Sequence, residues 1–477
     1  MMLRIMKTDL RNMTADRTLL IVALLFIVVI SYGLYNGAAW VDRQKETLAA
    51  TAREEAERTA RLKAEIVGIE RGEREPGPFS DPRAPSRVGG SLGARYAAMP
   101  PAALAAFSVG QSDIYPYYFQ VSTRSKQTFL NNDEIENPTN LLAGKFDLAF
   151  VLIYLCPLLI LAISYNILSA EKEQGTLQMT LAQPVSLRTI VFSKIFGRVL
   201  IALSLTIIPT VTGFLLTDEI EDGSLSRLAL WALVAGSYAA FWFALALAVN
   251  ALGKSSATNA LALAGLWLLF VMIIPSLVSV ASTALYPVPS RVEMVQAMRS
   301  ASKLASARGS QLLAKYYEDH PELVPGSGSA NMDDFAARSI AVQDEVEREI
   351  QPVLARFDDQ LFRQQALVSR FRFISPALIA QTALNDISGS GLERYRHFLN
   401  LVDEYHARWS EYFRSRVFRK VLLREADYDE MPRFEFKEES SSTVARRAFA
   451  GWAGLATFAV LISLYAAARL RRYLPVG

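Results

Sequence analysis

The sequence predicts an all-α polytopic membrane protein, with six transmembrane helices and a mostly helical extracytoplasmic domain built from two inserts. Of its 477 residues, 51% are hydrophobic and only 20% are charged. The apolar residues gather in uncharged runs of roughly 19 to 22 residues, each long enough to cross a bilayer as a helix. Core helices of soluble proteins are rarely apolar on every face over such a length. The expected spans are 18–40, 147–168, 199–217, 228–249, 257–281 and 448–468.

Lysine and arginine near the span ends set the expected orientation, because they are enriched on the cytoplasmic side. Basic residues are frequent before the first span, between the second and third spans, and after the last span. The loop between the third and fourth spans, DEIEDGSLSR, is acidic instead. Both termini, the polar segment 169–198 and the tail 469–477 are therefore expected in the cytoplasm. The inserts, 41–146 and 282–447, are expected on the other side.

The opening segment, 1–17, is expected to form a helix that lies on the inner membrane surface. Leu3 and Leu10 fall on one helical face, whereas Arg4 and Lys7 fall on another. An ordinary basic flank with accidental periodicity is the alternative. The apolar run that follows is too long for the core of a signal peptide, which usually has about 7–15 residues.

The first insert is expected to begin as a helical stalk that continues the first span. Its alanines recur every four residues with charges elsewhere, at Ala52, Ala56, Ala60 and Ala64. The proline and glycine content of 74–101 argues against regular structure there. The stretch DIYPYYFQVS is expected to form a short strand.

The second insert is expected to be mostly helical. Its three predicted helices are 290–319, 331–371 and 391–423. The stretches PELVPGSGSAN and SPALIAQTALNDISGSG are expected to break the chain between them. Phe398, Leu401, Tyr405 and Trp409 give the last helix an apolar face. That face is expected to pack against the other outer helices rather than to form a ligand groove.

The sequence lacks the common catalytic motifs G-x-S-x-G, H-E-x-x-H and C-x-x-C. GKSS at 253–256 matches the end of a phosphate-binding loop, but Ala248 stands where the loop needs its first glycine. The lone Cys156 lies in the second span and excludes a disulfide within the chain. A net charge of +3 is too small to indicate a nucleic-acid partner. We therefore do not expect an enzyme.

Two acid–histidine pairs are conceivable metal ligands, Glu393 with His397 and Asp403 with His406. Such pairs are common on solvated helices, so no metal is expected. The uncharged runs also weigh against a carrier driven by protons or ions, which usually needs an ionisable residue within the membrane. Energy for any transport is then expected to come from elsewhere.

The polar segment between spans two and three reads SAEKEQGTLQMTLAQPVSLRTIVFSKIFGR. Gly175 is expected to end a helix that extends from the second span. Thr176 is expected to cap the next helix, which Pro184 ends. Leu177 and Leu181 give that helix a small apolar face.

Ser186 is expected to cap a further helix that leads into the third span. Glu171 and Glu173 stand at the mouth of the turn, where we expect them to be free to meet basic residues of a partner. A solvated loop with helix caps is the alternative. Caps alone do not account for the order of acid pair, Gly-Thr-Leu and proline in one short segment.

EKEQGTLQMTLAQPVSLRTIVFSK resembles the signature of ABC-2 type transporter permeases. In that family an E-x-E-x-G-T-L step follows span two, and a P-V-S step with a later lysine leads to span three. The matching residues are Glu171, Glu173, Gly175, Thr176, Leu177, Pro184 and Lys194. The six-span layout is also similar. NPTNLLAGKFDLAFVLIYLCPLL and SPALIAQTALNDISGSG resemble a bacterial branch with large extracytoplasmic inserts. Those inserts depart from simple members and leave the substrate open.

This resemblance implies the permease subunit of an ABC exporter in a bacterial inner (plasma) membrane. The helix after span two, including Leu181, would be the coupling helix that docks in a separate ATPase subunit. That subunit would bind ATP and Mg²⁺, so this chain would need no cofactor. A second permease chain, identical or paralogous, and membrane lipid would be its other partners.

Aromatic residues within the spans are expected along the substrate path, at Tyr165, Tyr238, Trp242 and Trp267. A mostly apolar path suits an amphipathic or lipid-like substrate better than a bare ion. Two alternatives stay open. A membrane-anchored extracytoplasmic receptor or scaffold would need only one or two spans, and a secondary carrier would need charges within them.

Overall fold

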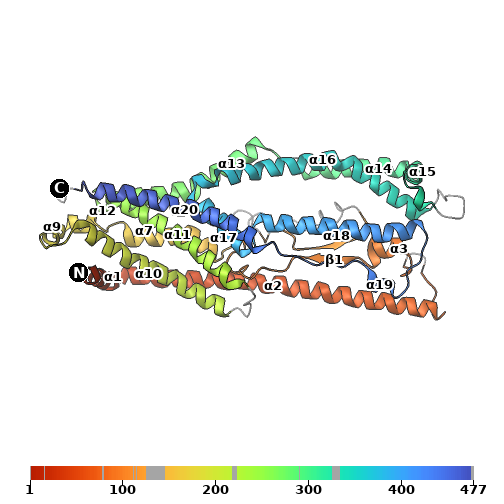
Figure 1. Ribbon diagram of the computed structural model, residues 1–477, viewed down its shortest axis with the longest axis horizontal. Helices are drawn as coiled ribbons and strands as arrows, with labels where there is room; N and C mark the ends of the chain where they lie inside the picture. Colours follow the sequence, from red (N-terminus) through yellow and green to blue (C-terminus); the bar gives the residue numbers. More distant parts are fainter. Residues whose placement is uncertain are drawn as a thin grey trace.

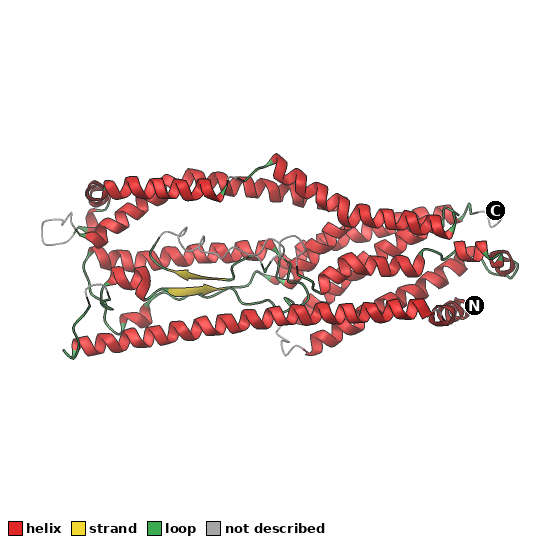
Figure 2. Cartoon of the chain, turned by 180° about the vertical axis from the view of Figure 1, so that it is seen from behind, coloured by secondary structure: helices red, strands yellow, loops and turns green. Residues whose placement is uncertain are grey.

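The computed structural model describes most of the chain as one elongated, largely helical molecule (Figure 1, Figure 2). The described residues are 2–15, 17–77, 80–110, 112–113, 115–124, 145–216, 223–288, 290–324 and 334–473. The acidic residues of the loop between spans three and four, and most of the expected break at 321–331, lie outside these ranges.

Within these ranges, six helices are long and apolar enough to cross a membrane, and each overlaps one expected span. Their bounds are Leu19–Glu70, Leu148–Glu173, Leu187–Leu215, Ser224–Asn250, Ser256–Leu285 and Ser441–Leu470. The chain is therefore an α-helical membrane protein. The apolar helices gather at one end of the molecule, with both termini, and the inserts occupy the other end (Figure 1). We call these the polar end and the insert end, after the polar segment 169–198 and the two inserts.

The first span and the stalk are one helix, α2 (Arg17–Glu70), of 54 residues. At about 1.5 Å per residue it is roughly 80 Å long, and it runs beside most of the molecule (Figure 1). Gly72, with φ of +72°, lies in the turn that follows it. The predicted stalk is confirmed. A shorter helix, α1 (Met2–Ala15), precedes α2 and packs against the third span.

The bundle core forms around α11 (Ser224–Asn250), which packs along α20 (Ser441–Leu470). The second span is assembled from α6 (Leu148–Phe150), the π-helical turn η2 (Val151–Leu155) and α7 (Cys156–Ser164). The third span is α10 (Leu187–Leu216). The fifth consists of α12 (Ser256–Trp267), η3 (Leu268–Ile273) and α13 (Ile274–Leu285).

The expected break at 375–391 is wrong, because a helix fills most of it. Ser375 caps α17 (Pro376–Ser388) by accepting from the Leu378 N–H, and Gly389 ends it in the left-handed conformation. Ile379 and Leu384 are buried in the bundle core. The serine, proline and glycines that suggested a break are the start and stop signals of this short helix. Thus α17 joins the second insert to the spans.

The first insert contains more regular structure than expected. Within 74–101, a short helix α3 (Pro85–Arg87) and a turn η1 (Val88–Leu92) precede the strand β1 (Arg95–Ala98). β1 pairs antiparallel with β2 (Tyr118–Val121), so the predicted strand is confirmed and gains an unexpected partner. The proline and glycine content of 74–101 indicated the turns correctly but gave no sign of the strand β1.

The apolar face of α18 (Leu392–Phe418) packs as expected, although its partners include the strands. Phe398, Tyr405 and Trp409 are fully buried with Phe119 and Val121 of β2. The short α19 (Asp427–Glu430) adds Tyr428 to the same core. This insert core is separate from the bundle core, and α17 lies between them (Figure 1).

A long helical arm forms the remaining part of the second insert. It contains α16 (Phe335–Phe371), which packs against α14 (Arg291–Ala307) and α15 (Gly309–Asp319). The expected single helix 290–319 is thus two helices that part at Arg308. Short 3₁₀ turns follow α15 at Pro321–Leu323 and α16 at Arg372–Ile374.

Candidate functional site

The polar segment projects from the polar end of the bundle as two short helices, α8 (Ser169–Glu173) and α9 (Thr176–Leu181) (Figure 1). Gly175 separates them with φ of +68°. No atom lies within 4 Å of where its Cβ would be, so this turn needs glycine for its conformation and not for space. The predicted helix stop at Gly175 is confirmed.

Of the two predicted helix caps, Ser186 is confirmed and Thr176 is wrong. Ser186 accepts a 3.1 Å hydrogen bond from the Thr189 N–H and caps α10 as expected. Thr176 is not a cap, because it is the first residue of α9 and its hydroxyl donates back to the Glu171 carbonyl at 3.3 Å. The turn is thus closed from within, and Pro184 lies exposed beyond the end of α9.

Glu171 and Glu173 are not free for a partner, which corrects the sequence expectation. Glu171 accepts a 2.6 Å hydrogen bond from Lys194 Nζ on α10. Glu173 accepts from the Ser256 N–H at 2.7 Å and from its hydroxyl at 2.9 Å, at the start of α12. A carboxylate at a helix N-terminus is favoured by the helix dipole and the unpaired N–H groups there. The acid pair therefore fastens α8 to two spans.

A short break separates α8 from the rest of the second candidate span, Leu148–Glu173. After α7 ends at Ser164, residues 165–168 form turns. Side chains from other spans bond the backbone carbonyls around this break. The bonds run from Arg198 to Ile163, Asn250 to Ser164 (3.0 Å), Asn259 to Tyr165 (3.3 Å) and Lys194 to Ile167 (3.3 Å). Non-helical backbone at membrane depth is tolerated only where such partners satisfy it.

The donors at this break come from the third, fourth and fifth spans. Lys194, Arg198, Asn250 and Asn259 are all buried. Arg198 also pairs with Asp9 of α1 at 3.1 Å. The break is therefore a joint between α7 and α8, held by three neighbouring helices.

The exposed part of the segment is α9 itself. Leu177 is buried and Leu181 is half-buried, so the small apolar face of α9 points toward the bundle. On the opposite side, Met179 is 75% exposed, with Gln178 and Gln183 also exposed beside it. The sequence does not single out Met179, because it stands between Leu177 and Leu181, which face the bundle. Only the orientation of α9 in the structure shows that Met179 points away.

The four aromatic residues expected on a substrate path contribute to the bundle interior. Trp242 is fully buried, and the buried Tyr238 hydroxyl donates to the Ile153 carbonyl at 2.9 Å. Trp267 Nε1 donates to the Tyr154 carbonyl at 3.1 Å, and Tyr165 is half-buried at the break. Their place on a substrate path stays a prediction.

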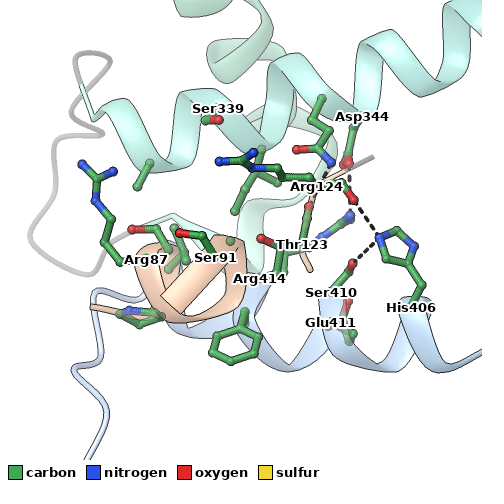
Figure 3. Close-up of a pocket in the computed structure, with 18 of the residues that line it drawn as sticks. Arg87, Ser91, Thr123, Arg124, Ser339, Asp344, His406, Ser410, Glu411 and Arg414 are labelled. Carbon is green, nitrogen blue, oxygen red and sulfur yellow. Dashed lines mark hydrogen bonds and ion pairs between the residues drawn. The ribbon is translucent and has the colours of Figure 1, made fainter. Parts of the chain in front are cut away.

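A second candidate site is a cavity of about 800 Å³ between α3, α16 and α18. Figure 3 shows that its walls carry charges of both signs. Two of its carboxylates are already paired, Asp344 with Arg414 at 3.1 Å and Asp334 with Lys420 at 3.4 Å. His406 contacts the Arg124 carbonyl at 2.9 Å. Burial raises the pKa of Asp344, and Arg414 opposes this shift. The mutual pairing favours a structural role for these charges.

The histidines of the two acid–histidine pairs, His397 and His406, contact backbone oxygens. His397 Nε2 lies 2.7 Å from the Lys437 carbonyl, as His406 Nε2 lies near that of Arg124. Within the described ranges, no three His, Cys, Asp or Glu side chains gather as a metal site would require.

The fold and this site define the class of the protein: a helical membrane protein with six candidate spans and large inserts. Residues 291–437 match the model of a family described as a domain of unknown function, DUF3526. The match covers the arm, α17, α18 and α19, and so most of the second insert. No curated protein matches the chain.

Proposed function

We propose that this chain is the membrane-spanning permease subunit of an ABC exporter, of the ABC-2 type. The observation that carries the proposal is the way α9 is exposed and attached to the bundle. This short helix projects from the polar end with Met179 exposed, while α8 behind it is fastened to the third and fifth spans. A docking helix needs an exposed face and a stiff connection, and α9 has both.

In this proposal a separate ATPase subunit grips α9, binds ATP and Mg²⁺, and closes on them. A force applied to α9 is transmitted to α8. From α8 it reaches α10 through the contact of Glu171 with Lys194. It passes to α12 by the contact of Glu173 with Ser256. The turns at 165–168 allow α8 to move relative to α7. Matched residues of the ABC-2 signature thus act by transmitting force, while the exposed face of α9 makes the contact.

The energy required is moderate. Shifting a two-state bundle from 1:99 to 99:1 needs about 5.5 kcal/mol of differential binding, which nucleotide-driven closure can supply. The apolar runs within the spans hold no ionisable side chain, because Lys194 and Arg198 lie at the polar end of the third span, where each is paired with an acid. This supports an external energy source over a proton- or ion-driven carrier. The polar end then faces the cytoplasm of a bacterium, the inserts form an extracytoplasmic domain, and a second permease chain completes the transporter. An amphipathic or lipid-like substrate fits the apolar spans.

The test is the substitution Met179→Asp, with Phe362→Asp as its control. Both side chains are exposed large hydrophobics, but Phe362 lies on α16 in the arm. Each chain is purified from native membranes after mild cross-linking, and MgATP hydrolysis by the eluate is measured. Loss of one central contact typically costs more than about 1 kcal/mol, and about 1.4 kcal/mol is tenfold in affinity.

We expect the wild-type chain and Phe362→Asp to carry ATPase activity and Met179→Asp to lose most of it at equal membrane insertion. A wild-type chain without ATPase activity, or equal activity in all three, contradicts the proposal. The receptor alternative is supported by the 800 Å³ cavity of the inserts. It predicts no associated ATPase in any of the three preparations.

A further inference from the structure

Two apolar cavities lie end to end between the third and fourth spans. Their volumes are about 60 and 220 Å³. Leu203 of α10 and Gly236 and Ala239 of α11 line both of them. We treat them as one crevice, the α10–α11 crevice, whose two parts meet at these shared residues.

The crevice extends through most of the apolar layer. Its lining runs from Phe192 to Val211 on α10 and from Leu228 to Leu247 on α11. At about 1.5 Å per residue, each stretch is about 28 Å long. A bilayer core is about 30 Å thick. The crevice therefore follows the whole path of an extended chain that crosses one leaflet and enters the other.

Small residues on α11 keep the crevice open. Ala232, Gly236 and Ala240 recur at every fourth position, and both alanines are exposed. No atom lies within 4 Å of where a Cβ at Gly236 would be. The opposite face of α11 packs along α20, and α10 packs against α1 and α2. The two helices are thus held from behind and leave the space between them unfilled.

The volume and lining of the crevice select its occupant. A helix is about 10–12 Å across with its side chains, so a helix of another chain could cover the crevice but not enter it. The hydroxyls of Thr206 and Thr210 donate to carbonyls of their own helix, Ala202 at 2.8 Å and Thr206 at 2.7 Å. They leave an essentially apolar wall. An alkyl chain matches such a wall.

One polar group indicates the head of that chain. Trp231 lines the crevice about two turns from the insert end of α11, and its side chain is 2% exposed. Within the part of the chain that the structure describes, its buried Nε1–H has no acceptor. Buried tryptophan N–H groups usually find one. A lipid ester carbonyl is an acceptor attached to an alkyl chain.

We propose that the α10–α11 crevice binds the acyl chain of one membrane phospholipid. The ester carbonyl lies toward Trp231, and the chain passes Gly236 toward Phe192. Binding needs the spans to lie in a bilayer but needs neither an ATPase nor transport. The inference therefore stands apart from the proposed permease function.

The test is Gly236→Leu, which fills the crevice where its two parts meet. Gly265→Leu is the matched control, because Gly265 lies on the exposed face of α12 and also has no atom within 4 Å of an added Cβ. Both changes add the same apolar side chain to a span without a clash. Gly236→Ala gives a smaller filling, and Trp231→Phe removes only the N–H.

The full-length variants are purified in mild detergent, and bound phospholipid is counted by native mass spectrometry. They are also reconstituted in vesicles of phosphatidylethanolamine and phosphatidylglycerol with a photoactivatable acyl chain. We expect one retained phospholipid and cross-links within 192–211 and 228–247 for the wild-type chain and Gly265→Leu. Retention should fall at least tenfold in Gly236→Leu and by less in Gly236→Ala and Trp231→Phe.

Equal retention in Gly236→Leu and Gly265→Leu, at matched thermal unfolding midpoints, overturns the proposal. So do cross-links spread evenly over α12. A change from dimer to monomer in Gly236→Leu, with lipid retention unchanged, would assign the small residues of α11 to a protein contact and would also overturn it.

Discussion

Asn250 is the residue whose loss should loosen the joint in the second span most directly. Its side chain is 1% exposed. Its amide donates to the Ser164 carbonyl at 3.0 Å, and its oxygen accepts from the Leu168 N–H at 3.3 Å. Asn250→Leu keeps the volume and removes both bonds. It also removes the 2.9 Å bond from the same amide to the Ala246 carbonyl of its own helix and the 3.5 Å bond from Asn259. The Ser164 carbonyl and the Leu168 N–H then remain buried without this partner.

The expected cost is about 1–3 kcal/mol. A side-chain hydrogen bond between membrane helices is worth about 0.6 kcal/mol on average and up to about 1.7 kcal/mol. Leaving a buried partner unsatisfied costs about 1–3 kcal/mol in soluble proteins. The two lost bonds to the second span, at the lower, membrane values, give the stated range. The added apolar burial of leucine reduces the cost.

Two measurements test this estimate. Unfolding in mixed micelles reports the change in free energy, and hydrogen exchange reports the Leu168 N–H, which should exchange faster with little change elsewhere. Thr457→Val is the control, because its hydroxyl bonds only its own helix, at the Ala453 carbonyl. Unchanged exchange at Leu168 together with a stability change below about 0.3 kcal/mol would refute the assignment of this joint.

Three further outcomes are expected. Gly175→Val should cost about 1–2 kcal/mol through its left-handed turn, and Gly175→Asn should cost less; equal unfolding midpoints would exclude strain there. In a Cys156→Ser background, a cysteine at Ser80 should react with an impermeant reagent from outside and one at Ser186 should not; the reverse pattern inverts the proposed topology. Burial raises the pKa of Asp386 to about 6, above the usual value of about 3.9. The folded state therefore binds the proton more tightly, and this contribution to stability is full below about pH 4 and lost as the pH rises past about 6. Asp386→Asn should flatten that pH dependence of the unfolding midpoint, and an unchanged profile would contradict it.

The spans and the stalk could be predicted because their signals are local. Uncharged length defines a span, and the alanine period of α2 persists beyond the membrane. Helix ends were harder to interpret. Gly175 and Gly389 are equivalent as signals, since each ends a helix with positive φ. In the sequence, however, the glycine after α17 reads as part of a loop, because serine, proline and a second glycine surround it.

The position of the site could be predicted from the sequence, but its hydrogen bonds and ion pairs could not. Glu173 looks available to a partner because its own partner, Ser256, lies on another span. The break at 165–168 has no glycine or proline of its own. It exists because side chains such as Asn250 offer the carbonyls better partners than a continued helix would. Contacts between residues so distant in sequence leave no local pattern.

α11 links the two ends of the bundle. At the polar end it carries Asn250, which bonds both sides of the break beside α8. At the insert end it packs against α17, whose Ile379 and Leu384 share its core. A long, fully bonded helix moves as a unit, because close-packed interiors do not deform gradually. In the proposed permease, we therefore expect a displacement of α8 to displace the support of α17 and, through it, the base of the arm. The small residues of α11, Ala232, Gly236 and Ala240, also face the α10–α11 crevice. A lipid chain bound there would therefore either resist or permit the displacement.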